Sequence, residues 1–291
     1  MEVSGIELWQ WHQDAIAVAK SENIPVGEIN WLLREFTGLE ALSLRLGSFK
    51  GKPQVKMQIS LADLSKLWEQ RVTQRVPVQY LVQLSHWRHF CLTVSPAVLI
   101  PRPETECLIE LAMSYHSGIE GDWVDLGTGS GAIALGLAEA FPQATIHAVD
   151  VSPEALTIAR QNALRLGFAD RIEFYQGDWW QPLAGQISGL AGMVANPPYI
   201  PTQMVSQLQP EVAWHEPHLA LDGGVDGLDC VRQLIQSAPD YLQPRGIWLV
   251  ELMAGQAPMV VELLQASGAY LNIQIHTDLA GIERFVLAQI D

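Results

Sequence analysis

The sequence predicts an α/β protein with a mostly parallel sheet, preceded by a small N-terminal helical bundle. From residue 122 onward, short apolar runs typical of buried strands alternate with helical segments, which is the pattern of a parallel sheet covered on both faces. The last two predicted strands, 270–276 and 283–289, have only a short loop between them, so we expect a terminal antiparallel hairpin. Residues 1–75 show apolar residues at helical spacing.

Capping residues mark the helices of the first segment. Apolar residues recur at helical intervals in three stretches, 8–19, 29–36 and 61–68. Pro25 stands near the start of the second helix, Gly38 follows its end, and Ser60 is suited to cap the third. The segment 47–53 is predicted to be a loop. We expect this helical domain to span residues 1–77.

A β-hairpin is predicted to link the bundle to the α/β region. The runs VQYLVQL (78–84) and RHFCLTV (88–94) are typical of strands, and residues 85–87 lie between them. The segment LIPRPETE then begins a helix that runs to about His116. Two boundaries follow: a linker over 78–100 and an α/β domain over 101–291.

Strands and helices alternate in order through the α/β domain. The strands are expected at 123–127, 144–150 and 171–178, within 192–199, and at 246–252. The helices are expected at 132–141 and 152–167, from about 228, and near 258–266. Ser152 and Gly167 are suited to cap the second of these helices.

Charge is unevenly distributed along the chain, whose formal net charge is −15. Residues 1–90 hold ten Lys and Arg against nine Asp and Glu, whereas residues 91–291 hold seven Arg, no Lys and 23 acidic residues. The shift indicates two units with different surfaces, although a compositional habit of the source organism would produce the same shift. Because nucleic-acid binding depends on Lys and Arg neutralising phosphates, the acidic unit argues against direct nucleic-acid binding.

The composition is that of a globular protein in a reducing compartment, with 48% apolar and 17% charged residues. No apolar run reaches the roughly 18 residues that span a bilayer, and the N-terminus lacks a signal-peptide pattern. Cys91, Cys107 and Cys230 form no CxxC pair, so neither a disulfide framework nor a structural zinc site is expected. We expect a cytoplasmic monomer with no membrane partner.

Two further segments suggest metal sites by composition, but their spacing argues against metal binding. In HEPH (215–218), a proline interrupts the helix that two-histidine sites use. DGGVDGLD (222–229) lacks the spacing and final glutamate of an EF-hand, and is interpreted as a glycine-rich loop. No metal is expected.

Two strand ends predict a site for a ligand that contains a ribose. DLGTGSG (125–131) follows the first predicted strand, and its three glycines allow a sharp turn against which a ligand can lie. Its spacing is neither the dinucleotide fingerprint G-x-G-x-x-G nor a P-loop. Asp150 ends the next strand, where a carboxylate can accept both ribose hydroxyls. S-adenosylmethionine fits these features better than a dinucleotide.

The segment Gly177-Asp178-Trp179-Trp180 follows the third strand and has two interpretations. Asp178 can accept the exocyclic amine of adenine, and an aromatic ring can cover the base. Tryptophan pairs also fill cores, so both interpretations stay open.

The tetrapeptide Asn196-Pro197-Pro198-Tyr199 indicates the chemistry. Two prolines remove two N–H donors and hold the chain extended, which leaves the Pro197 carbonyl without a partner. The side-chain oxygen of Asn196 is a second acceptor beside it. A planar NH₂ group has two donors, so two fixed acceptors can orient its nitrogen toward an electrophilic methyl, with Tyr199 packed on the planar group.

These motifs together resemble class I S-adenosylmethionine-dependent methyltransferases that modify amide or amine nitrogen. The segment LIPRPETECLIE (99–110), combined with NPPY, resembles the signature of the HemK/PrmC release-factor glutamine methyltransferases. That family has a helical N-terminal domain, a hairpin linker and a Rossmann-like catalytic domain, so the resemblance covers nearly the whole chain. The family's linker usually carries a glycine and then a phenylalanine where this chain has Gln83 and Trp87.

The resemblance implies a role for each motif. The turn that packs against the methionine part of the cofactor would be Gly127, Thr128, Gly129, Ser130 and Gly131. Asp150 would take the ribose, and Asp178 with Trp179 the adenine. Asn196 and Pro197 would grip the substrate amide, flanked by Pro198 and Tyr199, and Asn196 would also border the cofactor. Arg102, Glu104 and Thr105 would lie over the pocket, although Arg102 could instead pair with Glu104 or Glu106.

The resemblance also implies the reaction and the partner. A methyl group would pass from S-adenosylmethionine to the side-chain nitrogen of the glutamine in the GGQ motif of peptide chain release factors, which supports translation termination and leaves S-adenosylhomocysteine. Three alternatives stay open: a glutamine methyltransferase of a ribosomal protein, an adenine-N6 nucleic-acid methyltransferase that flips its base, and a non-enzymatic adaptor that binds the cofactor.

Overall fold

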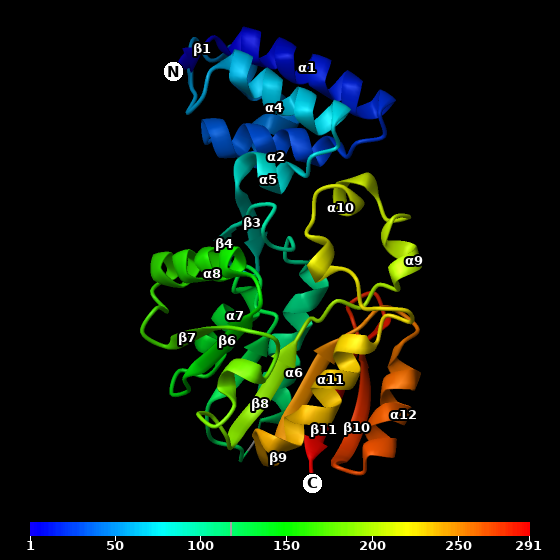
Figure 1. Cartoon of the computed structure of the whole chain (residues 1–291). Helices are drawn as coiled ribbons and strands as arrows, with labels where there is room; N and C mark the ends of the chain where they lie inside the picture. Colours follow the sequence, from blue (N-terminus) through cyan, green and yellow to red (C-terminus); the bar gives the residue numbers. More distant parts are fainter. Residues whose placement is uncertain (117) are drawn as a thin grey trace. The chain divides into compact units, whose positions relative to one another are not determined.

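The computed structural model describes residues 1–116 and 118–291 (Figure 1). The chain forms two units. The first comprises Met1–Gln83 together with Pro210–His215, and the second comprises Leu84–Gln209 together with Glu216–Asp291.

The first unit is helical, as the apolar spacing predicts. Its helices are α1 (Gly5–Ser21), α2 (Val26–Thr37), α3 (Ala41–Leu46), α4 (Leu61–Thr73), α5 (Val78–Val82) and α10 (Pro210–Ala213). The predicted caps are confirmed, because Ser60 accepts the backbone N–H of Asp63 at the start of α4 and Gly38 ends α2 in the left-handed conformation. A short antiparallel pair, β1 (Glu2–Val3) and β2 (Val55–Lys56), lies beside them.

The expected loop at 47–53 contains one turn of 3₁₀ helix, Ser48–Gly51. Phe49 at its centre is fully buried in the core of this unit, and Gly5 of α1 packs directly on its backbone. The apolar anchor explains why a glycine- and lysine-rich segment is ordered here.

A segment from far along the chain belongs to this unit. Glu211 of α10 forms ion pairs with Arg71 (2.9 Å) and Arg75 (2.8 Å) of the α4 end, and Arg71 also pairs with Glu28 of α2. The ring of His215 contacts the backbone oxygen of Gln74 at 2.7 Å. Arg71 is only 2% exposed, so these carboxylates are the partners that its buried charge requires.

The predicted strand at 78–84 is wrong. Val78–Val82 forms α5, which begins after Pro77 and ends at Gln83 with a φ of 57°. Five residues are too few for their apolar pattern to separate a strand from a helical turn, and Pro77 favours the helix start. The family's usual glycine at this position fits the left-handed backbone that Gln83 adopts here.

The hairpin begins later than predicted. Its strands are β3 (Leu84–Trp87) and β4 (Phe90–Thr93), so residues 85–87 form a strand and the turn lies at Arg88 and His89. The Trp87 indole is 1% exposed and donates to the Arg102 carbonyl at 3.0 Å, which ties the hairpin to the segment before helix α6 (Cys107–Tyr115).

The second unit is built on a seven-stranded sheet in the order β10-β11-β9-β8-β5-β6-β7. The strands are β5 (Trp123–Leu126), β6 (Ile146–Asp150), β7 (Ile172–Gln176), β8 (Leu190–Ala195), β9 (Leu242–Glu251), β10 (Tyr270–Thr277) and β11 (Glu283–Ile290). The β5 to β9 strands pair in parallel, whereas β11 is antiparallel to both β9 and β10. The predicted parallel sheet with a terminal hairpin is confirmed.

Helices cover both faces of this sheet (Figure 1). They are α6 (Cys107–Tyr115), α7 (Ala132–Ala140), α8 (Pro153–Leu166), α11 (Asp229–Ser237) and α12 (Ala257–Ser267). The short helix α9 (Thr202–Val205) belongs to the segment between β8 and β9. Side chains alternate along each strand, so Trp123 packs in the core with α6 and α7 while Val124 packs in the core with α11 and α12.

The strand order reverses at β5, whose neighbours are β6 and β8. In open α/β sheets the crevice at such a reversal, beyond the carboxyl ends of the strands, is where ligands bind. The glycine turn follows β5, Asp150 ends β6, Asp178 follows β7 and NPPY follows β8. The fold therefore brings all four predicted motifs to one edge.

Candidate active site

A cavity of about 580 Å³ lies at this edge within the second unit. That volume is in the range of small-molecule sites. Most of the predicted site residues line it: Gly127, Thr128, Gly129, Ser130, Asp150, Asp178, Trp179, Asn196 and Pro198. Gly131, Pro197 and Tyr199 are outside the lining. Residues from the segment before α6, including Leu99, Pro101 and Thr105, complete the wall.

Backbone hydrogen bonds hold the glycine turn against β6. The N–H groups of Gly127 and Thr128 both donate to the Val149 carbonyl at 2.9 Å. Gly127 and Gly131 have φ values of 80° and 84°, which side chains rarely adopt, and a Cβ on Gly131 would lie 3.2 Å from the Ala159 Cβ. The turn therefore needs glycine for its shape and for the close approach of α8.

A buried carboxylate fixes the same turn from beneath. Asp125 is fully buried, and one of its oxygens accepts the Thr128 hydroxyl (2.6 Å) and the Ala134 N–H (3.0 Å). Burial raises the pKa of the Asp125 carboxyl to about 7. No pattern in the sequence predicts a role for Asp125, and its contacts identify it as the support between β5 and the start of α7.

Asp150 lies at the cavity wall with both carboxylate oxygens already accepting backbone donors. One accepts the Gly129 N–H at 2.8 Å and the other the Ser152 N–H at 2.9 Å. Burial raises the pKa of this carboxyl, while these backbone donors oppose the rise. The Val151 N–H is a third backbone donor to this carboxyl. Three of the four lone pairs of the carboxylate are then engaged, and the remaining one can accept a hydroxyl group of a ligand in the cavity.

The two tryptophans after β7 have separate positions. Trp179 lines the cavity in a left-handed backbone conformation (φ 45°), and its ring lies 3.4 Å from where a Cβ on Gly127 would be. Trp180 is 4% exposed and stacks on Tyr241 with ring centroids 4.6 Å apart. Trp180 therefore fills the core, whereas Trp179 lines the cavity wall, and its contact with an adenine ring stays a prediction.

Asn196 is oriented by a chain of contacts from distant parts of the sequence. Its side-chain nitrogen donates to the Thr105 hydroxyl at 3.3 Å, and Thr105 in turn donates to the Glu251 carboxylate. With the nitrogen engaged in this way, the Asn196 side-chain oxygen is left as an acceptor. Glu251 is 1% exposed, and burial raises the pKa of its carboxyl to about 7.

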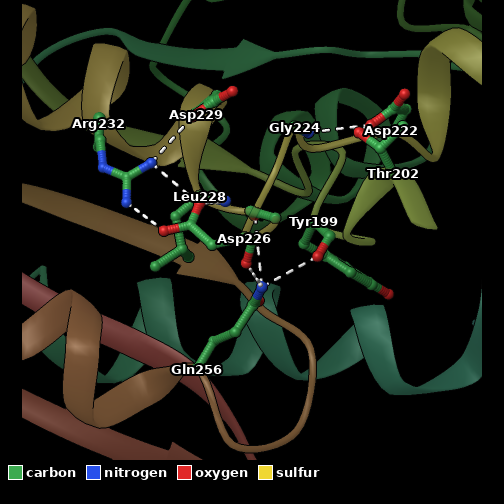
Figure 2. Close-up of polar contacts among 10 residues, drawn as sticks. Tyr199, Thr202, Asp222, Gly224, Asp226, Leu228, Asp229, Arg232 and Gln256 are labelled. Atoms are coloured by element: carbon green, nitrogen blue, oxygen red, sulfur yellow. Dashed lines mark hydrogen bonds and ion pairs between the residues drawn. The ribbon is translucent and has the colours of Figure 1, made fainter. Parts of the chain in front are cut away.

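Pro198 lines the cavity with Asn196, whereas Pro197 and Tyr199 lie outside the lining. Pro197 is buried, and within the described residues no hydrogen bond reaches its carbonyl oxygen. The Tyr199 hydroxyl makes a long contact of 3.4 Å with a Glu251 oxygen, and burial raises the pKa of this phenol. The Tyr199 carbonyl accepts the buried side-chain amide of Gln256 at 3.0 Å (Figure 2).

The segment before α6 meets the loop after NPPY through an ion pair. Arg102 contacts Glu216 at 2.6 Å, and the Glu216 side chain is 1% exposed. Glu106, one of the partners considered for Arg102, accepts the backbone N–H of Arg88 instead. Thr105 lines the cavity as the resemblance implied, whereas Arg102 and Glu104 do not.

Glu251 and Gln256 are the site residues that sequence analysis missed. Both belong to the end of β9 and the turn after it, on the edge where NPPY also lies. Both residues lie at or just after the end of a strand beside β8, and this position could have marked them as candidate site residues. The atoms that they contact are 52 and 57 residues away in sequence, which no local pattern reveals.

Two general findings concern the described residues as a whole. Across 1–116 and 118–291, no cluster of three or more His, Cys, Asp or Glu side chains has an arrangement that could hold a metal. None of the helices in this part of the chain combines the length and apolar character needed to cross a membrane.

The chain is similar to known proteins in sequence and in fold. A family model described as a methyltransferase domain matches residues 120–187. The release factor glutamine methyltransferase of Synechocystis sp. is 54% identical, covering 99% of this chain and 97% of that protein. The protein of the same name from Thermosynechococcus vestitus is 47% identical, covering 97% and 96%. The hMettl16 catalytic domain, solved with MAT2A 3′UTR hairpin 6, is similar in fold, with a TM-score of 0.55, 15% identity, and coverage of 80% and 84%.

Proposed function

The chain belongs to the release factor glutamine methyltransferase family, and on that premise we propose that it transfers a methyl group from S-adenosylmethionine to a glutamine side-chain nitrogen of a release factor. The observation that carries the proposal is Asn196 at the cavity wall. Its side-chain nitrogen is bound to Thr105, so its oxygen is free to accept an amide hydrogen.

The cavity fits the cofactor at its glycine-turn end. Nothing lies within 4 Å of where a Cβ on Gly129 would be, so a ligand can approach that backbone closely. We assign the methionine part to the turn 127–131, the ribose to Asp150, and the adenine to Asp178 and Trp179. The bound cofactor supplies an electrophilic methyl group on its sulfonium, and the protein supplies orientation.

Positioning is the main task of the NPPY end. The Asn196 side-chain oxygen and the Pro197 carbonyl each accept one hydrogen of the glutamine NH₂, which fixes the nitrogen and its direction. As that nitrogen gains positive charge, its N–H groups become stronger donors, so these bonds strengthen in the transition state. The nitrogen then releases one proton to water, which leaves a neutral N-methyl amide. Orientation of this kind can lower a barrier by about 7–11 kcal/mol.

The test is to locate a transferred label. The protein is incubated with methyl-labelled S-adenosylmethionine and, separately, with release factors, ribosomal proteins or DNA. We expect label on a release-factor glutamine. Label on a ribosomal protein or on adenine would select one of the alternatives, and cofactor binding without any transfer would indicate an adaptor.

The first unit is assigned to substrate recognition, and the protein to the cytoplasm as a monomer that does not bind nucleic acid directly. The net acidity of residues 91–291 supports the last point. Lys50, Lys52 and Lys56 are exposed in the first unit, with Lys50 placed 3.8 Å from the centre of the Trp9 ring. These lysines can attract acidic surfaces of a protein partner.

Charge removal tests this assignment. The double variant Lys52→Gln/Lys56→Gln should methylate an intact release factor about 2- to 5-fold more slowly at low salt, with the difference vanishing at high salt. Its rate on a short glutamine peptide should be unchanged. Lys20→Gln/Lys66→Gln removes the same charge elsewhere in the unit, and an equal loss in that pair would contradict a local role.

A further inference from the structure

Gln256 joins three backbone segments at the edge of the sheet. Its side chain is 2% exposed. Its oxygen accepts the Met253 N–H at 3.0 Å, and its nitrogen donates to the Tyr199 carbonyl at 3.0 Å. The carbonyls of Asp226 and Gly227 lie 3.3 and 3.4 Å from the same nitrogen (Figure 2). The turn after β9, the NPPY segment and the glycine loop 222–229 therefore meet at one amide.

The glycine loop packs directly on the NPPY backbone. A Cβ on Gly227 would lie 2.2 Å from the Tyr199 carbonyl oxygen, and one on Gly223 would lie 2.6 Å from the Pro198 carbonyl oxygen. Ile200 donates to the Leu221 carbonyl at 3.0 Å and accepts the Gly223 N–H at 2.9 Å. Only glycine allows the two backbones to approach so closely, so the loop packs tightly against the backbone of NPPY.

The outer side of the loop is held by exposed contacts. Arg232 of α11 pairs with Asp226 and Asp229, and the Thr202 hydroxyl donates to Asp222 at 2.7 Å (Figure 2). Exposed ion pairs contribute little to stability. The buried amide of Gln256, with no water to replace its bonds, is the stronger attachment of the two.

We propose that Gln256 is a positioning residue, which aims the Asn196 side chain and the Pro197 carbonyl by fixing the Tyr199 carbonyl against the glycine loop. The inference rests on the proposed function. Its mechanical basis is the two prolines, since each ring fixes φ near −65° and leaves the short chain between the carbonyls of Pro197 and Tyr199 few ways to move. A displacement at Tyr199 is therefore transmitted to the substrate-binding acceptors.

The main test is Gln256→Glu, which keeps the shape and removes both N–H donors. A misplacement of ~1 Å can cost about 10²-fold in rate, so we expect turnover on a glutamine peptide to fall about 10- to 100-fold. The dissociation constant for S-adenosylmethionine should stay within about 2-fold, because other loops form that end of the cavity. Gln265→Glu makes the same change on the exposed side of α12 and should have no effect.

Gly227→Ala tests the same contact from the opposite side. Its methyl group would lie 2.2 Å from the Tyr199 carbonyl oxygen and 2.6 Å from the Gln256 side-chain nitrogen, so it would force the two apart while Gln256 keeps its chemistry. We expect the same loss of turnover with unchanged cofactor affinity. Gly255→Ala is the matched control, because Gly255 also has a positive φ (91°) but nothing lies within 4 Å of where its Cβ would be. This pair decides the question if Gln256→Glu does not fold.

Amide hydrogen exchange separates this inference from the proposed function. Exchange at Ile200 and Gly223 should be faster in Gln256→Glu and Gly227→Ala than in either control, with no substrate present. Unchanged exchange, near-normal turnover, or parallel losses of turnover and cofactor affinity would overturn the positioning role. Absence of methyl transfer by the unmodified protein, with the exchange difference intact, would overturn the proposed function alone.

Discussion

The two ends of the cavity are assembled from contacts of very different range. At the glycine-turn end, the side-chain hydrogen bonds join residues 2 to 32 positions apart, from Asp150–Ser152 to Asn162–Ser130. At the NPPY end, they join residues 52 to 91 positions apart: Tyr199–Glu251, Tyr199–Gln256 and Asn196–Thr105. One end is a local structure, and the other depends on the fold as a whole.

This difference determines what each end can do. A local turn of glycines and one carboxylate can bind a nucleoside in many folds, because its geometry follows from adjacent residues. An acceptor pair that must orient a substrate nitrogen needs support from outside its own segment, because NPPY has few backbone donors with which to fix itself. Substitutions at the two ends should therefore affect different measured quantities.

The largest effect is expected from Asn196→Ala. Loss of one of the two acceptors should lower turnover by about 10²- to 10³-fold, the range for one preorganised hydrogen-bond partner of a transition state. Cofactor affinity, measured by calorimetry, should change little. Near-normal turnover would contradict the role assigned to NPPY, because substitutions at the two ends of the cavity would then not differ in their effect on turnover.

The reciprocal change is Asp150→Ala at the glycine-turn end. Loss of a charged acceptor should weaken S-adenosylmethionine binding by about 1.5–3 kcal/mol, with turnover at saturating cofactor much less affected. Asp170→Ala removes an exposed acid from the same unit and should bind normally. Unchanged affinity in Asp150→Ala would place the ribose elsewhere.

Thr105→Val tests the long-range support directly. Valine keeps the shape but can neither accept from Asn196 nor donate to Glu251, so Asn196 loses its fixed orientation. One neutral hydrogen bond contributes about 0.5–1.5 kcal/mol, which corresponds to a turnover loss of roughly 2- to 12-fold. Thr157→Val on the exposed face of α8 is the matched control. Equal turnover in both variants would remove Thr105 from the support.

The range of the contacts also explains what could be predicted from sequence. The βα alternation, the glycine turn, Asp150 and the Ser152 cap are encoded by neighbouring residues, and their positions in the structure follow the sequence patterns. The roles of Glu251 and Gln256 depend on which strand lies beside β8, which is a property of the topology. Residues 78–82 were predicted wrongly because five residues carry too weak a pattern to distinguish a helix from a strand.

The smallest effect is expected in the pH dependence of stability, and it probes the buried acid of the NPPY end. Burial raises the pKa of Glu251 to about 7, above its ordinary value of 4.5. Between those values the unfolded chain has lost the proton while the folded chain retains it, so the folded state binds more protons. Glu251 therefore makes stability fall as pH rises through this window.

Glu251→Gln removes that titration. The difference in Tm between Glu251→Gln and the unmodified protein should increase by a few degrees as pH rises from about 4.5 to 7. Any constant change in Tm that the new amide introduces would leave this trend unaltered. Glu262→Gln, an exposed acid on α12, should show no such trend. Asp125, buried beneath the glycine turn with a pKa also raised to about 7, remains in both proteins, so its contribution cancels in the comparison. A flat difference between Glu251→Gln and the unmodified protein would mean that Glu251 is charged in the folded state, and that the contact between Glu251 and the Tyr199 hydroxyl is a charge-assisted hydrogen bond.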